Sequence, residues 1–463
     1  MTDPATGRSA PRAAGEMGGS RAMPKHVYFE TYGCQMNVAD TELMRGALGK
    51  AGYVETSDPA SADVLLVNTC AVRDHAEQRV LGRMGELKQH KRPGVVLGVV
   101  GCMAQRLGPR LLEQAPHVDL VIGPDGYRGL ADLIAGAAAG DRRADVTFRP
   151  WEHYEDVPPR RETGRSSAFV TVQRGCNYRC TFCVVPMTRG RERSRTLSDV
   201  LREVGDLAAA GVTEVTLLGQ TVNSYHDGEH DFADLLRAVG GVDGIRRLRF
   251  TSPYPNDFTA RVVDAMAEVP AVCEHVHLPV QSGSSRVLKR MGRRYDREGY
   301  LHCVDRLRNA IPALALTTDI IVGFPGESAA DYQATEDLVR DVGFDDAYTF
   351  RYSPREATGA LRLPHAVPNA VAQDRLERLI ALVRDVAKRR NVALVGGVHE
   401  VLVEGVARRG NLLQCRTRTN KVVLVDGPAE WIGTYHTVRL TGTTGSTFTG
   451  VPAAAGRELA VVG

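Results

Sequence analysis

The chain has 463 residues, of which 43% are hydrophobic, and its formal net charge is only +3. This length predicts about three domains with buried cores. The small net charge gives no indication that the protein binds nucleic acid. Nine cysteines, an odd number in a long chain, are atypical of a secreted disulfide framework and favour a reducing compartment. No window approaches the roughly 18 apolar residues of a membrane span, so we expect a soluble, cytoplasmic protein without a membrane partner.

The N-terminal part begins with a tail and continues as an α/β domain. Residues 1–25 are rich in Gly, Ala, Ser and Pro and lack the apolar stretch of a signal peptide, which predicts a disordered tail. Over residues 26–140, short apolar runs alternate with amphipathic stretches, as in a parallel α/β domain. The expected strands are His26–Thr31, Ala62–Asn68, Val95–Val100 and Leu120–Ile122.

Three cysteines follow predicted strands of this domain, namely Cys34, Cys70 and Cys102. Any one of them alone fits an ordinary buried cysteine. The carboxyl ends of parallel strands share one rim, however, so the three thiols should converge there. This pattern favours a three-cysteine iron–sulfur site. The remaining cysteines lack partners at metal-ligand spacing and are expected to be structural: Cys273, Cys303 and Cys415.

Residues 141–166 lose all periodicity, which predicts a linker. From Pro158 to Arg195 the chain carries nine arginines against two glutamates. Such a run of arginines fits a solvated surface as well as a binding site. Its position in the fold is needed to choose between the two.

A second group of cysteines follows in one tight loop, Gly175–Cys183. Cys176, Cys180 and Cys183 supply three thiolates, one too few to close a four-iron cluster, so one iron is left open to another molecule. Zinc is the rival interpretation. A structural zinc site takes four N or S ligands, and no partner pair lies nearby, so the spacing favours the cluster.

The cysteine loop opens a predicted barrel domain, residues 167–390. Six strand-like runs alternate with helical stretches such as Leu197–Ala210 and Ala329–Val342. About 190 residues are too few for the roughly 250 of a closed eight-unit barrel, so we expect a partial (β/α)6 barrel with function at the carboxyl ends of its strands. The expected strands are Phe169–Val172, Glu214–Leu218, Arg247–Phe250, His275–Pro279, Ala315–Val322 and Ala347–Arg351.

A helical connector near Val371–Arg390 leads to the last predicted domain, residues 391–455, with a tail at 456–463. Short strands with turns between Val398 and Val451 predict a small five-stranded, OB-like β-barrel. Such barrels bind oligonucleotides, but a balance of six basic against four acidic residues is only mildly basic, so composition alone favours a generic β-barrel over an RNA binder.

The loop Cys176-x3-Cys180-x-Phe182-Cys183 resembles the signature of the radical S-adenosylmethionine (SAM) enzymes. The resemblance implies that the open iron binds the methionine moiety of SAM. It also implies one-electron cleavage of SAM to a 5′-deoxyadenosyl radical, chemistry that belongs to the cofactor.

From Lys25 to Val451 the order of parts resembles the methylthiotransferase family, whose last domain is the RNA-binding TRAM module. The motifs that carry this resemblance are Thr31-Tyr-Gly-Cys-Gln-Met-Asn37, Asn68-Thr-Cys-Ala-Val-Arg-Asp74, Gly101-Cys-Met-Ala-Gln105, Gly175 to Arg195, Leu217-Leu-Gly-Gln-Thr-Val-Asn-Ser-Tyr225 and His277-Leu-Pro-Val-Gln-Ser-Gly-Ser284. The stretch after Cys183 is most similar to members that act on isopentenylated tRNA, although Met187 and Thr221 depart from their usual pattern.

The resemblance implies two 4Fe-4S clusters and a division of labour between them. The cluster on Cys176, Cys180 and Cys183 would cleave SAM, and the auxiliary cluster on Cys34, Cys70 and Cys102 would carry the sulfur. Adenine C2 of N6-isopentenyladenosine, next to the anticodon, would receive sulfur and methyl together. The expected partners are the tRNA anticodon stem-loop and an electron donor such as a flavodoxin-type protein, and the chain is expected to be a monomer.

Further site residues follow from position. Candidates for binding SAM lie in the cysteine loop and after barrel strands, although each also suits an ordinary turn: Phe182, Gly219, Gln220, Asn223, Gln281, Ser282 and Asp319. Arg189, Arg191 and Arg193 are candidates for contacting RNA phosphates, and Arg195 for phosphate or the SAM carboxylate.

Three alternatives remain open. The chain could be a sibling enzyme with another substrate, an iron–sulfur protein in which clusters only regulate RNA binding or sense redox state, or a zinc-dependent RNA-binding protein. Metal analysis and an assay of reductive SAM cleavage distinguish them.

Overall fold

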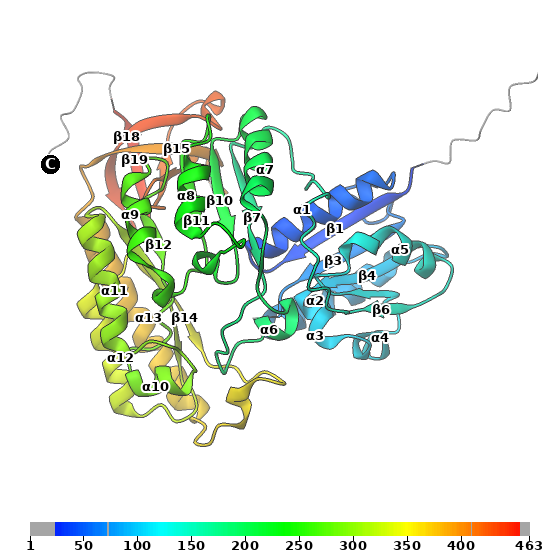
Figure 1. Ribbon diagram of the computed structural model, residues 1–463, viewed down its shortest axis with the longest axis horizontal. Helices are drawn as coiled ribbons and strands as arrows, with labels where there is room; N and C mark the ends of the chain where they lie inside the picture. Colours follow the sequence, from blue (N-terminus) through cyan, green and yellow to red (C-terminus); the bar gives the residue numbers. More distant parts are fainter. Residues whose placement is uncertain (1–23, 72–73, 409, 454–463) are drawn as a thin grey trace, which may run out of the picture.

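A computed structural model describes residues 24–71, 74–408 and 410–453 of the chain (Figure 1). The two predicted tails lie outside these residues, apart from positions 24 and 25. Within the described part, no helix is long and apolar enough to cross a membrane.

The N-terminal part is a six-stranded parallel sheet with the strand order β2-β1-β3-β4-β5-β6. Its central strands β3 and β4 are buried along their whole length, as continuous apolar runs predict for a parallel sheet covered on both faces. The elements are β1 (His26–Tyr32), α1 (Gln35–Lys50), β2 (Val54–Glu55), β3 (Val64–Thr69), α2 (Asp74–Leu87), β4 (Val96–Gly101), α3 (Cys102–Leu107), α4 (Arg110–Gln114), β5 (Leu120–Ile122), α5 (Leu130–Ala138) and β6 (Arg143–Asp145).

The two faces of this sheet carry separate apolar clusters. On one face, Leu43, Met44 and Leu48 of α1 pack with Ile134 of α5 against the sheet. The other face is packed by residues of α2, α3 and α4, among them Met84. Alternation of strands and helices along the sequence therefore gives the layered α/β fold that was predicted.

The central part is an open barrel of six parallel strands with helices outside. Its strands are β7 (Ser167–Thr171), β10 (Glu214–Leu218), β11 (Arg247–Phe250), β12 (His275–His277), β13 (Ala315–Val322) and β14 (Asp346–Arg351). Its helices are α6 (Val185–Arg189), α7 (Leu197–Ala209), α8 (Phe232–Gly240), α9 (Ala260–Glu268), α10 (Ser285–Arg290), α11 (Arg297–Ala310), α12 (Ala329–Val342) and α13 (Asn369–Val392).

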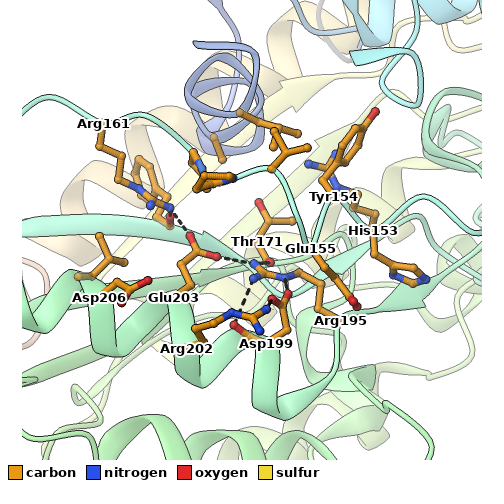
Figure 2. Close-up of a pocket in the computed structure, with 18 residues that line it drawn as sticks. His153, Tyr154, Glu155, Arg161, Thr171, Arg195, Asp199, Arg202, Glu203 and Asp206 are labelled. Carbon is orange, nitrogen blue, oxygen red and sulfur yellow. Dashed lines mark hydrogen bonds and ion pairs between the residues drawn. The ribbon is translucent and has the colours of Figure 1, made fainter. Parts of the chain in front are cut away.

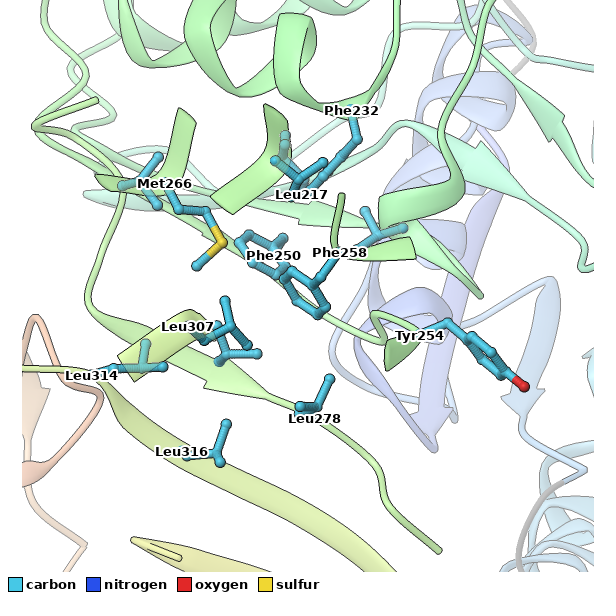
Figure 3. Packing of buried hydrophobic residues seen from close by; sticks show 14 of the residues in the cluster. Leu217, Phe232, Phe250, Tyr254, Phe258, Met266, Leu278, Leu307, Leu314 and Leu316 are labelled. Atoms are coloured by element: carbon cyan, nitrogen blue, oxygen red, sulfur yellow. The ribbon is translucent and has the colours of Figure 1, made fainter. Parts of the chain in front are cut away.

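The hydrogen-bonded ladder of the barrel is not continuous. It consists of two three-stranded sheets, β11-β10-β7 and β12-β13-β14. An isolated bridge between Leu248 and Val272, just before β12, links the halves. Large apolar side chains such as Phe250, Phe258 and Met266 hold them together by packing between the strands and their helices (Figure 3). The six predicted strands are thus present, but side-chain packing replaces part of the ladder.

The C-terminal part is a closed five-stranded barrel with the order β15-β16-β17-β19-β18. Its strands are β15 (Val398–Val406), β16 (Leu413–Thr417), β17 (Val422–Val425), β18 (Tyr435–Thr443) and β19 (Thr447–Pro452), with Phe448 and Val423 in its core. In Figure 1 this barrel lies against the green strands of the central part, and α6 lies between the central part and the N-terminal sheet. The segment that follows the second cysteine loop is therefore where the two α/β parts meet.

Candidate active site

Strand register brings the first three cysteines to one edge of the N-terminal sheet. β1, β3 and β4 are neighbours, with Tyr32 opposite Thr69 and Thr69 opposite Gly101. Each cysteine follows one of these strand ends within one or two residues. Cys34 stands before the first residue of α1, Cys70 follows β3 directly, and Cys102 begins α3. The strand register therefore places the three cysteines at the same carboxyl edge of the sheet, as the sequence predicts.

A buried polar network holds the turns that carry these thiols. Asn37 accepts a hydrogen bond from the Cys34 backbone N–H at 3.4 Å and donates to Asn68 Oδ1 at 2.9 Å. Asn68 in turn donates to the Asn37 carbonyl at 2.8 Å. Gly101 has φ +95°, and a Cβ there would lie 2.4 Å from Asn68 Oδ1, so this turn requires glycine. Asn37 and Asn68 therefore hold the turns that place the three cysteines at this edge of the sheet.

The three thiols differ in electrostatic environment. A hydrogen bond with the Cys70 thiol and the positive charge of Arg189 lower the pKa of Cys34 to about 6. Burial raises the pKa of Cys102, although Arg189 lies beside it and acts in the opposite sense. Metal ligation deprotonates thiols, so a metal group here would displace the proton that burial favours on Cys102.

The second cysteine loop is closed at its base by a short antiparallel pair of strands. β8 (Gln173–Arg174) pairs with β9 (Arg193–Ser194), so the intervening loop and α6 form one excursion from the barrel. Gly175 has φ +78°, and a Cβ would lie 2.0 Å from the Arg191 carbonyl oxygen, so only glycine fits. Its N–H donates to Gln220 Oε1 at 2.5 Å.

Each thiol of this loop has a polar neighbour. Cys176 Sγ lies 3.1 Å from Thr221 Oγ1, and Cys183 Sγ accepts from the Val185 backbone N–H at 3.5 Å. Arg293 Nη1 donates to Cys180 Sγ at 3.3 Å. Burial raises the pKa of the Cys176 thiol, and raises that of Cys183 to about 12.

Arg293 was not identified from the sequence. Its guanidinium lies over the rings of Tyr254 and Tyr295, with its carbon 4.3 and 4.8 Å from the ring centroids. It is far from Cys180 along the chain, and no spacing rule connects the two. Thr221 was noted only as a departure from the usual pattern, and its contact with Cys176 gives that position a role in the loop.

Each thiol group contributes one cysteine to the wall of a cavity of about 2130 Å3. Cys34 of the N-terminal sheet and Cys183 of the barrel loop both line it. Between them, Val184 and Met187 pack with Ala71 and Cys102 in one apolar cluster. The segment after Cys183 thus joins the two groups directly.

The predicted SAM-binding residues divide into two sets. Phe182, Gln281 and Asp319 line the cavity, and Gln281 has a left-handed backbone, φ +72°. Strained backbone of this kind is concentrated at functional sites. Asp319 Oδ2 lies 3.3 Å from His277 Nε2, which also lines the cavity.

The other four candidates are supports rather than cavity-lining groups. Asn223 is buried and exchanges two hydrogen bonds with the Tyr254 backbone, at 2.9 and 2.7 Å. Ser282 is fully buried beside Thr335, and the Gln220 side chain is engaged by Gly175. Gly219 packs closely on Gln173. The side chains of Gln220, Asn223 and Ser282 form hydrogen bonds at these turns.

The arginine predictions need correction. Arg189 is only 3% exposed, and Arg193 is paired with Asp125 and donates to the Glu152 carbonyl, so neither is available to RNA phosphates. Arg191 is exposed and stays a prediction. A run of arginines does not reveal from sequence which members face inward.

Arg195 also forms ion pairs within the protein. It lies in a smaller pocket of about 250 Å3 between α1, the linker and α7 (Figure 2). It pairs with Asp199 at 2.5 Å and with Glu203 at 2.6 Å, and Arg161 of the linker also pairs with Glu203. Its guanidinium is therefore not free to bind a SAM carboxylate.

The donors fit iron–sulfur groups in their chemistry. Each set supplies three thiols, and each has one arginine that donates to a predicted ligand sulfur, Arg189 to Cys102 at 3.2 Å and Arg293 to Cys180. Arg189 Nη1 is buried and has no hydrogen-bond partner among the described residues. Within that part of the chain, no three His, Cys, Asp or Glu side chains are placed to hold a single metal ion.

Comparison with known proteins decides the family. Residues 26–123 match the model described as uncharacterized protein family UPF0004, and residues 170–339 match the radical SAM superfamily. The tRNA-2-methylthio-N(6)-dimethylallyladenosine synthase of Caldicellulosiruptor saccharolyticus is 45% identical over 424 residues, 90% of each chain. The protein of the same name from Geobacter sulfurreducens is 45% identical, over 90% of this chain and 95% of its own. The one from Moorella thermoacetica is 46% identical, over 89% of this chain and 94% of its own.

The chain belongs to the tRNA-2-methylthio-N(6)-dimethylallyladenosine synthase family.

A solved structure supports the fold of this family member. The radical SAM methyltransferase TsrM from Kitasatospora setae, solved with cobalamin and a [4Fe-4S] cluster, superposes with a TM-score of 0.57 at 15% identity, over 73% of this chain and 74% of that one. At this identity the likeness concerns the fold alone.

Proposed function

We propose that the protein converts N6-isopentenyladenosine next to the anticodon of tRNA into its 2-methylthio derivative, as a radical SAM methylthiotransferase. One observation carries the proposal: two three-cysteine groups, from separate parts of the chain, each place one cysteine in the wall of one cavity, in a chain that is 45% identical to a synthase of this name. Replacing an aromatic C–H by C–S–CH3 requires a hydrogen abstractor and a sulfur donor at the same substrate atom.

Cys176, Cys180 and Cys183 would hold a SAM-binding 4Fe-4S cluster, and Cys34, Cys70 and Cys102 an auxiliary one. When bound, the first would supply one-electron cleavage of SAM, and the second would supply the sulfur, with the methyl group coming from another SAM molecule. Arg293 and Thr221 orient the first ligand set through Cys180 and Cys176. Asn37 and Asn68 hold the second.

The cavity walls would position the substrates. Phe182, Gln281 and Asp319 are the remaining candidates for contacting SAM, since their side chains line the cavity. Its volume of about 2130 Å3 exceeds the roughly 300–1,000 Å3 of small-ligand pockets and leaves room for a nucleotide of a loop beside SAM. Anticodon-loop bases are already unpaired, which lowers the cost of bringing one into the cavity.

The C-terminal barrel supports a tRNA-binding role, because Thr419 and Asn420 of one turn and Ser446 of another also line the cavity. We assign it as a TRAM domain, residues 391–455, following a barrel domain at 167–390, a linker at 141–166 and an N-terminal domain at 26–140. Arg191, exposed at the end of the cysteine-loop excursion, is the remaining candidate of the basic run for phosphate contact. A flavodoxin-type electron donor, a monomeric state and a cytoplasmic location complete the proposal.

The test is anaerobic reconstitution with iron and sulfide, incubation with SAM, a reductant and isopentenylated tRNA, and mass analysis of the digested nucleosides. A 2-methylthio-N6-isopentenyladenosine product is expected. Release of 5′-deoxyadenosine without that product would overturn the substrate assignment. Absence of both, in a chain with about eight irons, would favour the alternative of a cluster-containing RNA-binding protein.

A further inference from the structure

The buried guanidinium of Arg189 connects the two thiol groups. Arg189 ends α6, in the same short segment that begins with Cys183, yet its Nε donates to Cys102 Sγ at 3.2 Å. Nη2 donates to Asp40 Oδ2 of α1 at 2.7 Å, while Nη1 is buried without a hydrogen-bond partner among the described residues. A residue of the barrel thus reaches a predicted cluster ligand of the N-terminal sheet.

Carboxylate and guanidinium charges around Arg189 do not balance. Asp40 is fully buried and also accepts a hydrogen bond from Arg174 Nη1 at 3.0 Å, so two guanidinium groups share one carboxylate. The side chains of Arg174 and Arg189 are 7% and 3% exposed, so water does not screen the excess positive charge. Buried charge is stable when it is paired, and the one further polar contact of Arg189 is a ligand thiol.

We propose that Arg189 is a positioning residue that stabilises the anionic sulfur group held by Cys34, Cys70 and Cys102, through Nε to the Cys102 ligand and through the unpartnered Nη1 as a second donor to sulfur. This inference rests on the auxiliary cluster of the proposed function and deepens it. Arg293 has the corresponding place at the other thiol group, but its Nε and Nη2 donate to Tyr295 and to the Pro279 carbonyl.

The physical consequence is a shift in reduction potential. Hydrogen bonds to the sulfurs and nearby charge set the potential of an iron–sulfur cluster. Reduction adds a negative charge, and a fixed guanidinium favours that state, so Arg189 raises the potential of the auxiliary cluster. A residue that only tied α6 to α1 would affect stability and leave the potential unchanged.

The test uses the full chain with Cys176→Ala, Cys180→Ala and Cys183→Ala, so that only the auxiliary site can load. Its midpoint potential and its rate of iron loss to a chelator are measured with and without Arg189→Met. We expect a lower potential and faster iron loss. Arg189→Lys, which keeps the charge but not the planar fork, should lie between, and Arg191→Gln, an exposed arginine of the same segment, should match the parent.

Folding is controlled by the variant that combines Asp40→Asn, Arg174→Gln and Arg189→Met, which removes the buried carboxylate together with both guanidinium groups that pair with it. It should load iron and keep the lowered potential. Equal potentials in the parent and in both Arg189→Met chains would overturn this inference alone. A triple-cysteine parent that binds no iron while the native chain binds about four would overturn the auxiliary cluster of the proposed function, and this inference with it.

Discussion

Two arginines, one at each thiol group, donate a hydrogen bond to a predicted ligand sulfur, Arg189 to Cys102 and Arg293 to Cys180. Arg189 is buried and Arg293 is partly buried, so their charges are screened less by water than those of exposed side chains. The two cysteine patterns were visible in sequence because spacing and strand position indicate candidate ligands. The arginines were not, because their contacts arise from chain segments brought together only by folding.

At the residue scale, Cys70→Ala should separate the two activities. Iron should fall from about eight to about four per chain, while SAM is still cleaved to 5′-deoxyadenosine and the methylthio product is lost. The reason is that Cys176, Cys180 and Cys183 lie in a different part of the chain. Iron analysis and product chromatography check this.

The matched control is Cys415→Ala, a buried cysteine in the core of the C-terminal barrel. It should keep the full iron content. Loss of SAM cleavage in Cys70→Ala together with a full complement of iron would contradict the assignment of separate ligand sets.

At the scale of elements, the strands were largely predictable. Glu214–Leu218, Arg247–Phe250 and Ala315–Val322 match β10, β11 and β13 to the residue, because buried parallel strands are short apolar runs between helices. The break in hydrogen bonding between β11 and β12 was not predicted. The sequence pattern of a strand does not show whether the neighbouring strand is hydrogen-bonded to it. The buried roles of Asn223 and Ser282 were missed for a similar reason: a turn residue has the same sequence signature whether it binds a ligand or the backbone.

Helix α1 depends on a close approach by the linker. A Cβ on Gly46 would lie 2.1 Å from the Pro158 carbonyl oxygen, whereas one on Gly49, on the same helix, would meet nothing nearer than Arg160 Nη1 at 3.6 Å. Gly46→Ala should therefore displace the linker and destabilise the protein by about 1–3 kcal/mol, the range for overpacking. Gly49→Ala should be neutral or stabilise by up to about 1 kcal/mol through helix propensity.

Urea unfolding of both variants measures this difference. The linker also carries Arg161, which pairs with Glu42 of α1 and Glu203 of α7, so its displacement should loosen the contact between the N-terminal sheet and the barrel. Equal stability of the two alanine variants would show that the linker does not pack on α1 as described.

At the scale of the whole molecule, the three parts meet around one cavity. The C-terminal barrel is fastened to the central strands by arginines of β11. Arg247 is fully buried and donates to the Arg416 carbonyl at 2.8 Å and the Glu400 carbonyl at 3.0 Å. Arg249 donates to the Arg418 carbonyl at 2.8 Å and the Thr417 carbonyl at 2.9 Å. These contacts fix the barrel where its residues can line the cavity.

Arg247→Ala should release the C-terminal barrel, at a cost of about 3–5 kcal/mol for the loss of a buried charged partner. The adjacent Arg246→Ala is the matched control. Arg246 also pairs with Glu400, at 2.8 Å, but its side chain is 52% exposed, so its loss should cost about 1 kcal/mol or less.

Limited proteolysis near β15 and tRNA binding report the attachment of the barrel in both variants. Proteolysis that is equally slow in the two, with unchanged tRNA affinity, would contradict an attachment through Arg247.

The most direct test of the account is the magnetic coupling between two reduced clusters in the native chain, measured by electron paramagnetic resonance alongside iron and sulfide analysis. Two thiol groups on one cavity predict about eight irons per chain and mutual broadening of the two signals, which disappears when either ligand set is replaced by alanine. A chain that holds only about four irons, or two signals that are unchanged by removal of the other cluster, would contradict it.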